Sequence, residues 1–196
     1  NDGNKLDNVR NVSTGSGALF AIKGATTGAA STISINNFVA QSNIKDSENT
    51  LDTFANSGVL YLENLTSADG VLLSNSRFVN NDGVANGGAL IIKDCSGIVL
   101  NCLFEDNKVN VSGMDNIAVG GGAVYLSSTS NDNNNEIEIR NSTFINNSVT
   151  ASNSGLFAGG GAVLAKWITL KLTNIYAKNN EVSGDNMLAK GGAICS

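Results

Sequence analysis

The sequence has no histidine and no proline among its 196 residues. Without histidine, neither a Ser-His-Asp nor a Cys-His catalytic arrangement can form within the chain, and the commonest zinc ligand is missing. Charged residues are also scarce, at 15% of the chain, and the acids exceed the bases to give a net charge of -5. Because nucleic-acid binding needs a basic face, this balance argues against a nucleic-acid partner.

Long hydrophobic runs are lacking as well. The longest apolar stretches, such as 89–92, span a few residues, whereas crossing a bilayer takes about 20. We therefore expect no direct membrane insertion by this chain. Its hydrophobic content of 41% is nevertheless too high for intrinsic disorder, so the composition predicts a folded protein.

Cysteine is limited to three residues. Cys95 and Cys102 lie in one repeat and are the candidate disulfide, which requires the chain to bring their Cα atoms within about 7 Å. Cys195 would be left over and could pair between molecules. Free buried thiols are an equal alternative at this stage.

Asparagine and glycine are abundant, with 30 and 22 copies. Both residues tolerate the left-handed backbone conformation of tight turns. Short β-rich runs, such as 98–103 and 168–172, lie between these polar segments. Runs of this length, without a helical period, favour an all-β fold over an α-solenoid.

Two short motifs alternate along the chain. The first is a small-Gly-small-aliphatic tetrad: SGAL (16–19), SGVL (57–60), GGAL (87–90), GGAV (121–124), GGAV (160–163) and GGAI (191–194). The second is an aromatic residue followed three residues later by Asn or Gln: FVAQ (38–41), FVNN (78–81), FEDN (104–107), FINN (144–147) and YAKN (176–179). Successive tetrads are 30 to 41 residues apart, a period typical of solenoids and other repeat arrays.

These features predict a right-handed parallel β-helix of about six coils, with one coil per repeat. The tetrad would open one strand of each coil, and the aromatic would pack at a corner of the core. The Asn of the second motif would bond to turn backbone or to the Asn of the next coil.

Strand periodicity then predicts an outward ladder of large side chains. The residues that follow the aliphatic end of each tetrad face away from the core by the two-residue period: Phe20, Tyr61, Ile91, Tyr125 and Leu164. If exposed, this ladder is a candidate contact surface; the alternatives are an inverted register or covering loops. Four inserts are expected to be loops that carry partner specificity: 41–56, 108–119, 127–135 and 148–158.

The alternating GGA(I/L/V) and FxxN motifs resemble the passenger domains of the chlamydial polymorphic membrane proteins, a family of type V autotransporters. The resemblance implies a single β-helix fragment, residues 1–196, of a longer passenger displayed at the bacterial cell surface and outer membrane. It implies an adhesin whose partner is a host-cell surface protein receptor. In that family both motifs are tied to adhesion, so the resemblance implies that the residues of both motifs bind the receptor. These residues are Phe78, Asn81, Phe104, Asn107, Phe144, Asn147, Gly87, Gly88, Ala89, Leu90, Gly121, Gly122, Ala123, Val124, Gly160, Gly161, Ala162, Val163, Gly191, Gly192, Ala193 and Ile194.

Other functions are alternatives. A β-helix that binds or degrades polysaccharides would need carboxylates, or Ca²⁺ with a basic residue, gathered on one face to cleave its substrate. The acids of this chain are scattered along the sequence, so we expect no enzyme, no cofactor and no metal. A purely structural spacer is a further alternative. Self-association is also expected, because the ends of a β-helix carry unpaired strand edges.

Overall fold

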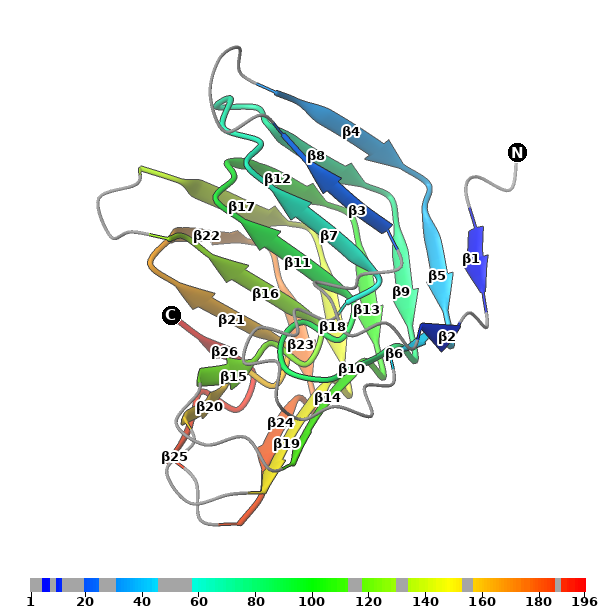
Figure 1. Cartoon of the computed structure of the whole chain (residues 1–196), viewed down its shortest axis with the longest axis vertical. Coiled ribbons are helices and arrows are strands. Elements are labelled where there is room, and N and C mark those ends of the chain that lie inside the picture. The colour runs from blue at the N-terminus through cyan, green and yellow to red at the C-terminus, as the bar shows by residue number, and fades with distance from the viewer. Residues whose placement is uncertain are drawn as a thin grey trace.

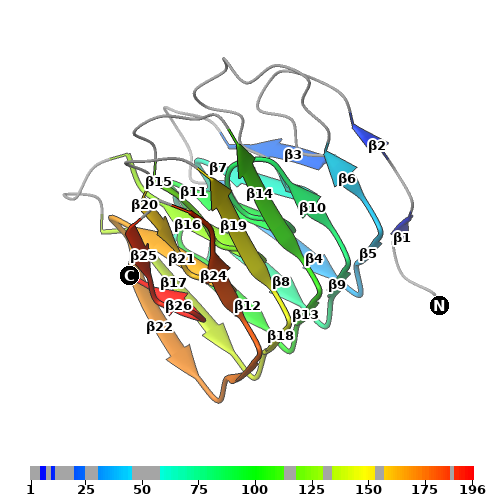
Figure 2. The same ribbon diagram turned by 90° about the horizontal axis from the view of Figure 1, so that it is seen from below.

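The chain forms a parallel β-helix (Figure 1). A computed structural model describes residues 5–7, 10–11, 20–24, 31–45, 58–112, 118–129, 134–152, 157–185 and 188–196. Strands from successive repeats pair in parallel, as Leu90 does with Leu60 and with Val124. Figure 2 shows the coils following one another from the N-terminal to the C-terminal strands. The all-β, parallel β-helix prediction is confirmed.

Sheets C and D form two adjoining faces of each coil. Sheet C contains the tetrad strands β3 (Phe20–Lys23), β7 (Leu60–Glu63), β11 (Leu90–Lys93), β16 (Val124–Ser127), β21 (Val163–Lys166) and β26 (Ile194–Cys195). Sheet D contains β4 (Ile33–Asn36), β8 (Val71–Ser74), β12 (Gly97–Leu100), β17 (Glu136–Arg140) and β22 (Thr169–Thr173). Their inward side chains alternate with outward ones, as the strand period requires.

Sheets A and B continue each coil. Sheet A contains β1 (Lys5–Asp7), β5 (Val39–Gln41), β9 (Arg77–Val79), β13 (Leu103–Glu105), β18 (Thr143–Ile145) and β23 (Tyr176–Lys178). Sheet B contains β2 (Arg10–Asn11), β6 (Ile44–Lys45), β10 (Asp82–Gly83), β14 (Lys108–Ser112), β19 (Ser148–Ser152) and β24 (Glu181–Ser183). No helix long and apolar enough to cross a bilayer occurs in the part of the chain that the structure describes.

Two of the predicted loop inserts are largely strand. Segments 108–119 and 148–158 supply β14 and β19, and they also supply β15 (Ala118–Gly120) and β20 (Phe157–Gly159). With β25 (Leu188–Lys190), the latter two form sheet E, beside the C-terminal strands of sheet C (Figures 1 and 2). Val109, Val149 and Ala158 lie in a second hydrophobic core between sheets B and E. The prediction of free loops is therefore wrong for most of these segments.

Left-handed polar residues turn the chain between sheets. Asn37, Asn75, Asn101, Asn141 and Asn174 have φ between 48° and 56° at the turn from sheet D to sheet A. The turn from sheet A to sheet B repeats this with Ser42, Asn80, Asp106, Asn146 and Asn179. Side-chain amides bond from coil to coil, as when Asn101 Nδ2 donates to Asn75 Oδ1 at 3.2 Å. The abundance of Asn thus follows from repeated turns that require positive φ.

Candidate functional site

The tetrad glycines close each coil. The first glycine is left-handed at Gly87, Gly121, Gly160 and Gly191, where φ lies between 54° and 65°. The second allows backbones to meet: a Cβ on Gly122 would lie 2.1 Å from Gly161 O and 2.6 Å from Ser148 O. Ala89, Ala123 and Ala162, with the aliphatic residues that follow them, point into the core and are fully buried. The tetrad is a structural motif in this chain.

The phenylalanines of the second motif form a buried stack on sheet A. Phe78 and Phe104 have ring centroids 5.1 Å apart, Phe104 and Phe144 have theirs 5.0 Å apart, and both pairs are nearly parallel. The first and last copies depart from the predicted alignment. Ala40 pairs with Phe78, and Ala177 pairs with Phe144, so FVAQ and YAKN are offset by two residues and one residue.

A size exchange explains these two offsets. The residue two positions before each stacked phenylalanine is small: Ser76, Cys102 or Ser142. Where alanine takes the stacking position, that residue is large instead, Phe38 before Ala40 and Ile175 before Ala177, and both pack on the core. The Phe38 ring centroid lies 5.6 Å from that of Phe78, and the two rings are tilted by 43°, so Phe38 extends the row of aromatic rings without being parallel to them. The large side chain has thus moved by two positions along the strand, to the neighbouring inward position.

The motif asparagines form a continuous ladder inside the turn. Asn81 Nδ2 donates to Asn107 Oδ1 at 2.8 Å, and Asn107 Nδ2 donates to Asn147 Oδ1 at 3.0 Å. Each amide also bonds the backbone of the preceding coil, as Asn107 Nδ2 does with Phe78 O at 2.9 Å. Asn43 and Asn180 continue the ladder, so neither Gln41 nor Asn179 belongs to it.

Burial limits what the motif residues can contact. The Phe and Asn side chains of the three central copies have no exposed area, and the tetrads of the three central repeats are buried as well. Among the four tetrads that the structure describes in full, only the last is accessible: Gly191 and Gly192 are exposed, while Ala193 and Ile194 are partly buried. A receptor therefore cannot reach the carried-over residues of the central coils without local unfolding.

The predicted outward ladder exists but is covered. Tyr61, Ile91, Tyr125 and Leu164 align across sheet C and form a cluster separate from the main core. None is more than 9% exposed. Backbone lies directly over two of them: a Cβ on Gly87 would lie 2.7 Å from Ile91 Cγ1, and one on Gly120 would lie 2.6 Å from Leu164 Cδ2. The prediction of an exposed contact ladder is therefore wrong, and the alternative of a covered ladder is confirmed.

Phe20 is not a member of this ladder. It pairs with Leu60, one residue out of the predicted register, and Ala21 takes the place beside Tyr61. Phe20 is 49% exposed, and its ring meets that of Phe38 edge-on with centroids 6.2 Å apart. Phe20 is thus aligned with Leu60 and the other inward-facing residues of sheet C, not with the ladder.

The three cysteines are free thiols, so the Cys95–Cys102 disulfide is not formed. Cys95 Sγ donates to Lys93 O at 3.1 Å, and Cys102 Sγ donates to Leu100 O at 3.3 Å. Burial raises the pKa of Cys95 to about 12 and that of Cys102 to about 11. Both thiols are therefore protonated and unreactive at neutral pH, whereas Cys195 is partly exposed.

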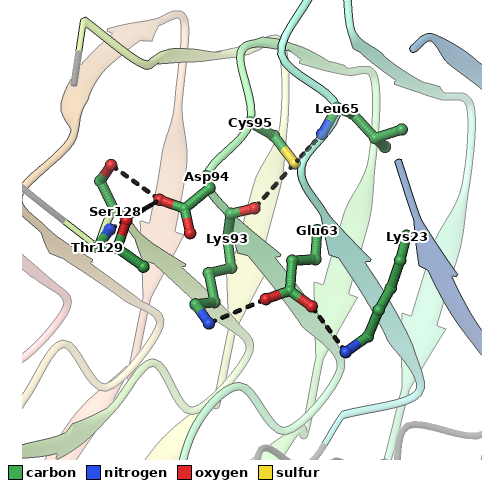
Figure 3. Close-up of polar contacts among 8 residues, drawn as sticks. All are labelled: Lys23, Glu63, Leu65, Lys93, Asp94, Cys95, Ser128 and Thr129. Atoms are coloured by element: carbon green, nitrogen blue, oxygen red, sulfur yellow. Dashed lines mark hydrogen bonds and ion pairs between the residues drawn. The ribbon is translucent and has the colours of Figure 1, made fainter. Parts of the chain in front are cut away.

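The outward-facing residues two positions after the ladder on the strands of sheet C are charged: Lys23, Glu63 and Lys93 (Figure 3). Glu63 lies between two ammonium groups, 2.8 Å from Lys23 Nζ and 2.9 Å from Lys93 Nζ. Burial by itself raises the pKa of Glu63, but the hydrogen bonds and charges of the two lysines outweigh it and lower the pKa. Glu63 is held ionised on an otherwise covered face.

Asp94 is held at the adjoining turn between sheets C and D. Its Oδ1 accepts hydrogen bonds from Ser128 Oγ at 3.1 Å, Thr129 N at 2.7 Å and Thr129 Oγ1 at 3.0 Å (Figure 3). Asp94 is 7% exposed and has φ of 51°. This carboxylate fixes the start of the segment that leads from sheet C into sheet D.

A polar groove runs beside these two carboxylates. Two adjoining hollows of about 600 and 380 Å³ share Thr66, Asn134 and Asn135 on their walls. Glu63, Lys93 and Asp94 line the smaller one, and the larger is lined by Asp69, Ser96, Gly97, Ile98, Glu136 and Glu138. Strands and turns of three successive coils supply these side chains, so the groove crosses the coils. Sequence spacing alone did not indicate it.

Comparisons with known proteins find no relative. No family model, no curated protein and no solved structure matches this chain. Among the described residues, no group of three or more Cys, Asp or Glu side chains is arranged to hold a metal ion.

Glu63 is expected to stabilise the fold in a pH-dependent way. Replacing Glu63 by Gln should lower the free energy of unfolding at pH 7 by about 1–2 kcal/mol, because two partly exposed charge-assisted bonds are lost. Since the folded-state pKa is lowered, this contribution is present at neutral pH and lost as the pH falls through that pKa. Urea unfolding of both proteins at pH 7 and pH 3 measures it.

The control for this prediction is Glu136→Gln, which removes the more exposed ion pair with Lys171. We expect its effect to stay below about 0.5 kcal/mol at both pH values. A Glu63→Gln effect of equal size at pH 7 and pH 3 would contradict the electrostatic origin.

Proposed function

We propose that this chain is a segment of a surface-displayed adhesin passenger that binds a host-cell surface protein through the polar groove. The location at the bacterial outer membrane and the class of partner come from the resemblance of the two alternating motifs to the autotransporter family. Since the motif side chains of the central coils are buried, their role in adhesion would be to build the rigid frame. The groove and its rim would make the contact.

The groove beside Glu63 and Asp94 is the observation that carries this proposal. It is lined by amide, hydroxyl and carboxylate groups that can bond a protein surface, and it is supported by stacked coils. A rigid site loses little conformational entropy on binding. Its five carboxylates exceed by one the four basic side chains that pair with them, Lys23, Lys93, Arg140 and Lys171, and this surplus favours a receptor loop with basic side chains.

The groove is better suited to binding a partner than to cleaving a polysaccharide. A general acid needs a raised pKa, but the pKa of Glu63 is lowered by its two lysines. Asp94 already accepts three hydrogen bonds from Ser128 and Thr129. Both carboxylates are thus engaged as structural acceptors, and this supports a recognition surface over an acid–base pair.

Blocking the groove tests the proposal. Thr66→Arg combined with Asn134→Arg places two long side chains at the shared, exposed part of the groove. Beads coated with this variant should bind cultured epithelial cells at least about tenfold less than beads coated with the parent, a loss of about 1.4 kcal/mol or more. Circular dichroism establishes that both proteins are folded.

The matched control adds the same two charges elsewhere, as Gln41→Arg with Asn110→Arg. Both residues are exposed on outward positions of sheets A and B. The control should bind like the parent. A folded groove variant that keeps full binding would remove the groove from the proposal, and a parent that binds no cells would count against an adhesin.

A further inference from the structure

Trp167 has a backbone conformation that its side chain disfavours. Its φ is 57°, and it occupies the turn between sheets C and D where the preceding coils have Asn64, Asp94 and Ser128. The other left-handed non-glycine residues in the described part of the chain are Asn, Asp or Ser. For a bulky residue this region is a genuine outlier, and such strain is concentrated at functional sites.

The Trp167 side chain is 51% exposed and thus gains little from burial. It borders a hollow of about 340 Å³ whose other walls include Phe157, Leu164, Lys166, Lys190 and Cys195. Its lining residues Phe157, Lys190 and Cys195 belong to β20, β25 and β26, the last strands of sheets E and C. Figures 1 and 2 show these three strands close together near the C-terminus. A strained and exposed aromatic residue at a hollow indicates a binding role.

Two lysines complete the hollow, each above an aromatic ring. Lys166 Nζ lies 4.3 Å from the centroid of Trp167, and Lys190 Nζ lies 5.6 Å from that of Phe157. Within the described ranges neither lysine has an acidic partner, although five other basic side chains do: Lys23, Lys93, Lys108, Arg140 and Lys171. In a chain of net charge -5, two positive charges thus line one hollow.

We propose that Trp167, Phe157, Lys166 and Lys190 form a binding site for a polysaccharide chain that carries repeated uronate residues. The apolar face of a pyranose ring stacks on an aromatic ring, whose π-face attracts the C–H groups of the sugar. A uronate carboxylate is attached directly to that pyranose, so a stacked sugar brings it to the adjacent ammonium group. The half-exposed ring of Trp167 offers the stacking surface, and two ammonium groups in one hollow match a chain with more than one carboxylate.

This site is separate from the groove and does not depend on the adhesin proposal. Its ligand is recognised by carboxylate charge and ring stacking, whereas the groove is lined by carboxylates of its own. The opposite charge of the two surfaces means that an acidic sugar chain is attracted to one and repelled by the other.

Tryptophan fluorescence tests the proposal on the whole chain, because Trp167 is its single tryptophan. A hyaluronan hexasaccharide, with three glucuronates, should produce a saturable change in the emission and heat in a calorimetric titration. Fully N-acetylated chitohexaose, an uncharged chain of six pyranoses, should produce neither. Replacing Lys166 and Lys190 together by Gln should weaken hexasaccharide binding at least tenfold, and raising the salt concentration should weaken binding to the parent.

Trp167→Asn separates a binding role from a structural one. Asn tolerates the left-handed backbone conformation, so this variant should melt about 2–4 °C higher than the parent. It should also show no measurable binding of the hexasaccharide by calorimetry. A lower melting temperature with unchanged affinity would overturn the proposal. So would equal binding of chitohexaose, an affinity that ignores the two lysines, or the absence of both signals with the hexasaccharide. Binding of 3′-sialyllactose in preference to the hexasaccharide would overturn the assignment to a uronate chain.

Discussion

Replacing Gly122 by Ala is expected to lower the free energy of unfolding by about 4 kcal/mol or more, or to prevent folding. The added Cβ would lie 2.1 Å from Gly161 O, 2.6 Å from Ser148 O and 2.7 Å from Ser148 N. All three are backbone atoms, which cannot rotate away as a side chain can. Relieving these steric clashes would require two coils to separate and the contact between sheets B and C to open. Urea unfolding followed by circular dichroism measures the effect.

Gly192→Ala is the matched control, since Gly192 holds the same position in the last tetrad. The nearest atom to its added Cβ is Asn180 O at 3.7 Å, an ordinary contact distance. We expect a change within about 0.5 kcal/mol. The two substitutions change the same motif letter, so equal effects would show that the close approach of backbones at Gly122 is not what requires glycine there.

Asn107→Ala is expected to cost about 4 kcal/mol of unfolding free energy. Asn107 Oδ1 accepts from Asn81 N at 3.1 Å and Asn81 Nδ2 at 2.8 Å, and Asn107 Nδ2 donates to Phe78 O and Asn147 Oδ1. The substitution leaves several buried polar groups without partners, and each costs about 1–3 kcal/mol. Thermal and urea unfolding measure the loss.

Asn110→Ala serves as the control, because Asn110 lies three residues away on an exposed position of β14. Its effect should stay within about 0.5 kcal/mol. The pair also distinguishes the two roles suggested for the FxxN motif. If Asn107 contacted a receptor directly, Asn107→Ala would keep its stability and lose only cell binding, which is the result that contradicts the ladder.

Much of the frame could be predicted because each repeat must bury the same positions. The tetrad strands pair as the alignment of Leu60, Leu90 and Val124 predicted, and the inward residues form one core. The motif predicted the wrong register in two coils, where Ala40 and Ala177 occupy the position of the stacked phenylalanines. The signal was present in the exchange of large and small residues two positions apart, but it is visible only once the coils are aligned.

The covered ladder and the two candidate sites could not be predicted in the same way. Strand periodicity tells which side of a sheet Tyr125 faces, but it does not tell what lies over that side. Segments that were expected to be loops instead form β15 and β20, and Gly120 of β15 lies directly over Leu164. The strain at Trp167 likewise follows from a register that aligns it with Asn64 and Asp94.

The sequence by itself determined the parallel β-helix, the coil length and the inward columns, because these depend on local period and on turns that need Gly or Asn. Tertiary structure alone decided which outward surfaces remain open. The groove at Asp94 and the hollow at Trp167 each combine side chains from coils about 30 to 40 residues apart. Such juxtapositions depend on the stacking register and on covering segments, and neither is a local property of the chain.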